Sequence, residues 1–81
     1  MRKMEVIWVE GKDGNIQHLA EHGVTPAEAE QVLREPIQRD HSRSSGRPIV
    51  FGFTASGRKL AVVYERVDAF TVYPITAFEV G

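Results

Sequence analysis

The pattern of apolar and polar residues divides the chain into a helical first half and a second half of strands. Residues 4–10 mix β-branched and aromatic side chains and predict a first strand, which a run of turn residues closes. Apolar residues then recur at helical spacing, namely Ile16, Leu19 and Ala20. We expect a helix over about residues 15–22, capped by Asp13 or Asn15 and ended by Gly23.

A second helix follows at once, because Thr25-Pro26-Ala27-Glu28 has the form of a capping box. In this motif the Thr25 hydroxyl accepts from the Glu28 amide and the Glu28 side chain reaches back, while Pro26 occupies a position that needs no N–H. The apolar stripe of this helix consists of Ala29, Val32 and Leu33. Pro36 ends the helix, so the pattern predicts two short helices joined by a tight elbow.

From residue 37 onward the pattern is that of strands joined by turns. A polar loop over residues 42–46 and a turn over residues 55–58 separate the expected strands, which cover residues 37–41, 48–54, 59–66 and about 70–80. The chain shows no repeat or linker, which favours a single domain over residues 1–81. The predicted fold class is α+β, with two short helices packed on an antiparallel sheet.

The central hairpin has a definite register if Thr54 pairs with Lys59 across the turn. A bulky face is then expected to cover the helices and carries Ile49, Phe51, Phe53, Leu60, Val62 and Tyr64. A smaller face stays open to a ligand and carries Val50, Gly52, Ala61 and Val63. This register sets Arg47 opposite Arg66. The register of the last strand stays open, because turns of two or three residues send Tyr73 to opposite faces.

The length, cysteine content and net charge of the chain limit which partners and which compartment we expect. A chain of 81 residues without cysteine has a small core and no disulfide, so we expect a partner chain, whether another protein or a second copy. The absence of cysteine fits a reducing compartment, and no long apolar run follows the N-terminus, so we expect a cytoplasmic protein without a membrane span. The net charge of −1 means that nucleic-acid binding needs a local basic patch.

Three stretches combine into a recognisable pattern: residues 15–29, the segment from Arg47 to Thr54, and Ser56-Gly-Arg-Lys-Leu leading to Ile75-Thr-Ala. Over about residues 8–77 this combination resembles the BrnT-like toxins, small bacterial ribonucleases of RelE-like fold from type II toxin–antitoxin modules. The resemblance implies a metal-independent endoribonuclease that needs no cofactor, cleaves RNA and thereby inhibits translation. It also implies a cognate antitoxin that covers the toxin.

Within this resemblance, His22, Arg47 and Arg58 match motif residues of the family. The chain departs from its relatives after Ile75-Thr-Ala, where they carry arginines and continue into a further basic helix. Phe78 and Glu79 occupy those positions. The missing positive charge keeps a second hypothesis open, a RelE-like binding or interaction module without catalysis.

Cleavage of RNA without metal requires a base for the ribose 2′-hydroxyl, cations around the phosphate and an acid for the leaving 5′-oxygen. We therefore assign catalysis to Arg47, Arg58, Lys59, His22 and Tyr64, and RNA binding to Arg66 and Tyr73. His41 and Glu65 are further candidate proton carriers. His18 and His22 lie four residues apart, but no third ligand is evident, so we expect no metal site.

Ordinary structural roles compete at each of these positions. The alternatives are a solvated edge pair for Arg47 and Arg66, turn and edge-strand charges for Arg58 and Lys59, and core or rim packing for Tyr64 and Tyr73. Arg47 and Arg58 also lie at opposite ends of the predicted hairpin, about 20 Å apart at the rise of a strand. Their membership of one site is therefore open.

Overall fold

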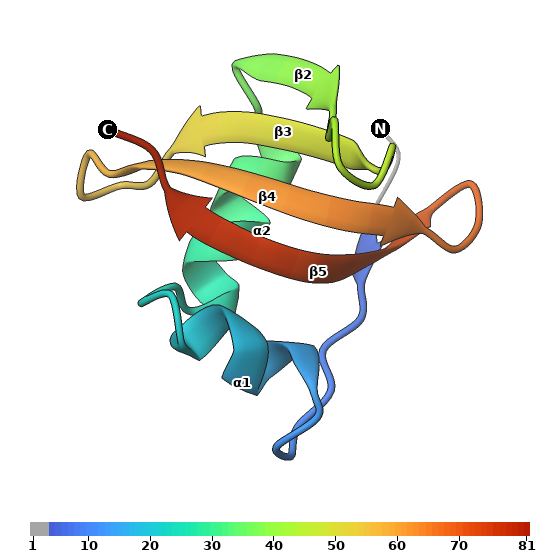
Figure 1. Cartoon of the computed structure of the whole chain (residues 1–81). Coiled ribbons are helices and arrows are strands. Elements are labelled where there is room, and N and C mark those ends of the chain that lie inside the picture. Colours follow the sequence, from blue (N-terminus) through green and yellow to red (C-terminus); the bar gives the residue numbers. More distant parts are fainter. Residues whose placement is uncertain (1–3) are drawn as a thin grey trace.

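A computed structural model describes residues 4–81 (Figure 1). Its elements are β1 (Glu5–Val6), α1 (Asn15–Ala20), α2 (Pro26–Arg34), β2 (Gln38–His41), β3 (Pro48–Phe53), β4 (Lys59–Arg66) and β5 (Thr71–Glu79). The strands form one sheet in the order β1-β5-β4-β3-β2, antiparallel except where β1 runs parallel to β5. The α+β class with two helices is confirmed, and the sheet is mixed where a wholly antiparallel one was expected.

The two helices share one side of the sheet. In Figure 1, α2 passes behind the strands and α1 lies below β5. The main core between these layers consists of Leu19, Val24, Ala29, Val32, Leu33, Val50, Leu60, Val62, Tyr64, Val72 and Ala77. No helix within residues 4–81 combines the length and apolarity needed to cross a bilayer.

The capping box of α2 forms as predicted. The Thr25 hydroxyl accepts from the Glu28 amide at 3.2 Å, and the Glu28 carboxylate accepts from the Thr25 amide at 3.1 Å. Gly23 has a φ of +74°, the left-handed conformation that the elbow between the helices requires. The predicted side-chain cap of α1 is wrong, because Gly14 occupies the N-cap position and no side chain caps it.

The Asn15 side chain does not cap α1 but forms hydrogen bonds to backbone groups that strand pairing beside β5 would otherwise satisfy. In a parallel ladder the amide of residue 74 would donate to the Ile7 carbonyl, but Pro74 has no N–H. The Asn15 side-chain nitrogen donates to the Ile7 carbonyl at 2.9 Å and to the Pro74 carbonyl at 3.1 Å. Its oxygen accepts from the Val9 amide at 2.8 Å. β1 therefore ends at Val6, well short of the strand that the sequence predicts.

The hairpin register differs from the expected one by a single residue. Phe53 pairs with Lys59, and the Thr54 amide donates to the Arg58 carbonyl at 2.9 Å, which leaves a loop of residues 55–57. Gly57, with a φ of +89°, takes the left-handed position that a three-residue hairpin loop requires. The prediction was wrong because it assumed a four-residue turn.

This shift exchanges the two faces of β3 while β4 keeps its expected facing. Val50 and Gly52 lie on the helix side, and Phe51 and Phe53 lie on the other. A β-carbon at Gly52 would come within 3.2 Å of a Val32 methyl group, so the glycine permits the close approach of α2.

The expected pairing of Arg47 with Arg66 is also wrong. The ladder between β3 and β4 ends with Ile49 paired to Val63, and its continuation places position 47 opposite position 65. Tyr73 pairs with Glu65, and this pairing defines the register of the last strand, which the sequence left open.

We predict that Asn15→Ala lowers the free energy of unfolding by about 2–4 kcal/mol, because three backbone groups lose their partner. Urea denaturation at fixed protein concentration measures this change. Gln17→Ala, at an exposed position on the same helix, serves as the control and should change stability by less than about 0.5 kcal/mol. An equal effect of the two substitutions would contradict the bridging role of Asn15.

Candidate functional site

The predicted catalytic residues are spread over separate parts of the molecule. Arg47 is exposed just before β3, where its amide donates to the Ser45 hydroxyl at 3.3 Å. His22 is exposed in the elbow between the helices, with its ring edge-on to that of His18 at 5.6 Å. Lys59 begins β4 on the face opposite the helices, beside Phe53. The fold therefore brings none of these three side chains together.

Arg58 is held by two carboxylates at the end of the sheet where the hairpin turns. Its guanidinium donates to Glu28 at 2.8 Å, to Glu79 at 3.2 Å and to the carbonyl of Gly23 at 3.2 Å. These contacts join the hairpin turn to the elbow, to the start of α2 and to the end of β5. A guanidinium neutralised in this way is poorly placed to bind phosphate, so the contacts favour the structural role for Arg58.

The electrostatics of this cluster are those of a mutual ion pair. The Thr25 amide and the Arg58 guanidinium hold the pKa of the Glu28 carboxyl below its ordinary value of 4.5. The hydrogen bond to Glu28 in turn raises the pKa of Arg58. Both groups therefore stay charged at neutral pH.

At the opposite end of the sheet, two of the predicted residues do come together. Tyr64 and Arg66 line a cavity of about 380 Å³ with Arg39 and His41 of β2, and we call it the basic cavity. The rest of its lining comes from Asp40, Pro48, Ile49 and Val50. Tyr64 is buried, whereas the two arginines and the histidine are exposed.

The ladder explains why these side chains converge. Tyr64 and Arg66 follow Val62 at intervals of two along β4, so all three point to the helix side. Arg39 pairs with Val50, whose side chain belongs to the core on that same side, and His41 follows Arg39 by two residues.

The lining of the basic cavity has more cationic than anionic side chains. The lining contains two arginines and one carboxylate, Asp40, a net charge of +1 with histidine neutral, and Asp40 alternates with Arg39 and His41 along β2. In the described part of the chain, Arg34 and Arg58 form ion pairs within 4.0 Å, whereas Arg39 and Arg66 form none. The Phe70 amide and, less strongly, the charge of Arg66 nevertheless lower the pKa of the nearby Asp68 carboxyl. Arg66 makes one long hydrogen bond, to the carbonyl of Ala69 at 3.4 Å. The guanidinium groups at this end are therefore less engaged by carboxylates than that of Arg58, which favours them as donors to an anion.

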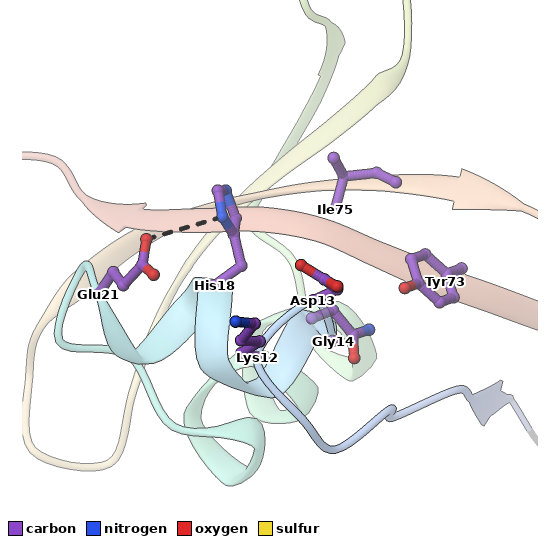
Figure 2. A pocket seen from close by; sticks show the side chains of 8 residues that line it. Lys12, Asp13, Gly14, His18, Glu21, Tyr73 and Ile75 are labelled. Carbon is purple, nitrogen blue, oxygen red and sulfur yellow. Dashed lines mark ion pairs between the residues drawn. The ribbon is translucent and has the colours of Figure 1, made fainter.

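A second cavity, also of about 380 Å³, lies between α1 and β5 (Figure 2). His18 and Tyr73 lie on either side of the loop that carries Lys12 and Asp13. Its charged lining is one lysine against Asp13 and Glu21, a net charge of −1, so this cavity is less suited to a polyanion. Tyr73, assigned from the sequence to RNA binding, lies here and not beside Arg66.

Arg39 was not selected from the sequence, and His41 was only a secondary candidate. Side chains alternate along the expected strand over residues 37–41, so Arg39 and His41 lie on one face of it. This alternation is the feature of the sequence that could have indicated the pair. Their convergence with Tyr64 and Arg66 depends on how β2 pairs with β3, which the sequence pattern did not define.

Comparisons of the chain with models of protein families, with curated proteins and with solved structures found no match. The resemblance to BrnT-like toxins therefore stays a hypothesis.

We predict that Glu28→Gln reduces the loss of stability on acidification. The folded-state pKa of Glu28 is lowered, so its contribution is present above the ordinary value of 4.5 and disappears as the pH falls through the folded value. Thermal unfolding followed by circular dichroism from pH 7 to about pH 3 measures the dependence. The control is Glu10→Gln, at an exposed position outside the cluster, which should keep the wild-type dependence of stability on pH. If Glu28→Gln also kept the wild-type dependence, the ion pair with Arg58 would be contradicted.

Proposed function

We propose that the chain is a BrnT-like, RNA-directed toxin domain that binds a phosphodiester in the basic cavity and cleaves it without a metal ion. One observation carries the proposal: Arg39, Arg66, His41 and Tyr64 line the same cavity. These residues supply two guanidinium groups, an imidazole and a phenol, the types of group that metal-free cleavage of RNA requires.

Each group has a role in the proposed reaction. The guanidinium groups of Arg39 and Arg66 hold the non-bridging oxygens and stabilise the charge of the pentacoordinate phosphate. The His41 imidazole takes the proton of the ribose 2′-hydroxyl, whose oxygen attacks the phosphorus. The Tyr64 phenol gives its proton to the departing 5′-oxygen. The products are a 2′,3′-cyclic phosphate and a free 5′-hydroxyl, and reprotonation of the phenolate by the imidazolium restores both side chains.

The architecture and the sequence resemblance support the same proposal. Two helices on one side of a mainly antiparallel sheet agree with the RelE-like fold that the resemblance implies. A cognate antitoxin is the expected partner, and the bacterial cytoplasm is the expected location. The motif residues Arg47 and Arg58 lie outside the basic cavity, so the proposed site uses cations from β2 and β4 instead.

The second candidate function is a RelE-like interaction module without catalysis. The engagement of Arg58 by Glu28 and Glu79 favours it, since a motif arginine is then structural. Glu79 also lies where relatives carry positive charge. Such a module can bind RNA or protein but leaves RNA intact.

We predict that the purified protein cleaves a labelled RNA oligonucleotide in the presence of a metal chelator and leaves a 2′,3′-cyclic phosphate end. Replacing both Arg39 and Arg66 by alanine should lower the rate by at least about 100-fold, because the phosphate loses its cations. His41→Ala should lower it by about 100-fold or more through loss of the base. Induced expression should arrest growth with the wild type and not with these variants.

The matched control is Lys12→Ala, which removes one exposed positive charge from the other cavity and should leave the rate unchanged. A wild-type protein that binds RNA in low salt but never cleaves it would support the module instead. Normal growth together with intact cellular RNA would contradict the toxin proposal.

A further inference from the structure

The helix-free side of the sheet carries an apolar cluster whose centre is buried and in which Thr76, the partner of Val63, is polar. Phe51, Ala61 and Phe78 form one row across three strands, because Ala61 pairs with both phenylalanines. Phe53 and Lys59 form the next row on one side, and Ile49 and Val63 form the row on the other. We call this surface the phenylalanine face, and it consists of Ile49, Phe51, Phe53, Ala61, Val63, Ile75, Phe78 and Val80.

Part of this face remains in contact with solvent. Phe53 is 52% exposed and Phe78 is 36% exposed, and no helix of residues 4–81 crosses this side of the sheet (Figure 1). Exposed apolar patches of this kind on a small protein mark interaction surfaces. A sheet face buries itself well against a second sheet face, with the two layers about 10 Å apart.

The charges along β4 indicate which partner fits. On this face β4 presents Lys59, Ala61, Val63 and Glu65 in turn, so a positive group and a negative group flank an apolar centre. Asp40 adds a second carboxylate at the Glu65 end, because it pairs with Ile49. Along β4 the face is therefore positive at the turn end and negative at the other, where the exposed Arg47 before β3 also lies.

The charges of Lys59 and Glu65 are complementary between two copies of the chain when the copies are related by one particular two-fold axis. An axis in the interface plane, perpendicular to β4 and between Ala61 and Val63, reverses the direction of β4 in the second copy. Lys59 of each copy then faces Glu65 of the other, and the apolar rows meet. An axis parallel to β4 instead sets Lys59 against Lys59 and Glu65 against Glu65, which repel.

We propose that a second copy of this chain covers the phenylalanine face, forming an isologous dimer with the two β4 strands antiparallel. The dimer removes apolar surface from water in a chain too short for a large core of its own. It leaves Arg39, His41, Tyr64 and Arg66 of the basic cavity uncovered, because these four lie on the helix side, whereas Asp40 and Ile49 of its lining belong to the strand faces of the other side. The dimer therefore does not depend on the proposed function.

The test is a charge exchange measured by sedimentation equilibrium from micromolar to millimolar protein, with circular dichroism to verify folding. The wild type should dimerise. Lys59→Glu and Glu65→Lys alone should each raise the dissociation constant by at least about tenfold, because each creates a like-charge contact at both ends of the interface. The double exchange should restore the wild-type constant, and Lys12→Glu, on the α1 side, should leave it unchanged.

The rescue is diagnostic because Lys59 and Glu65 lie six residues apart on one strand, about 20 Å, too far for a contact within one copy. Phe53→Glu provides a second test at a half-exposed position and should yield a folded monomer. A wild type that stays monomeric throughout, or a dimer that the double exchange does not restore, would overturn the proposal.

Discussion

The hairpin loop between β3 and β4 is the constraint on which most of this structure depends. Thr54 and Arg58 pair, and Gly57 takes a left-handed conformation, so three residues reverse the chain. Because side chains alternate along a strand, this loop decides which face each residue of β3 occupies. It sets Gly52 beneath α2 and Phe53 on the opposite side, so one local geometry fixes both the close packing of the helix layer and the apolar character of the other face.

The same loop also determines the structural role of Arg58. It delivers Arg58 to Glu28 and Glu79, where the arginine ties the hairpin to α2 and β5. Arg39 and Arg66, the cations of the proposed site, lie at the other end of the sheet. The arginines at the two ends thus differ: Arg58 is neutralised within the fold by two carboxylates, whereas Arg39 and Arg66 form no ion pair within 4.0 Å in the described part of the chain. The phenylalanine face lies between these ends on the opposite surface.

The sequence predicts local features of the fold better than its pairings. The capping box at Thr25 and the stop at Pro36 depend on neighbouring residues alone, and both were read correctly. The hairpin register failed because a four-residue and a three-residue loop differ only in whether Thr54 pairs with Arg58. The role of Asn15 depends on Pro74, 59 residues away, which no local pattern reveals. Tyr64 was selected from the sequence only because a phenol can carry a proton. Its neighbours Arg39 and His41 reach the basic cavity through the pairing of β2 with β3, which the sequence pattern left undefined.

The hairpin register can be measured directly by nuclear Overhauser contacts between α-protons, which are closest in the non-hydrogen-bonded pairs of an antiparallel ladder. The ladder described above predicts contacts of Phe51 with Ala61 and of Phe53 with Lys59. Contacts of Phe53 with Leu60 would show the other register. That result would move the phenylalanines to the helix side and contradict the arrangement of both faces.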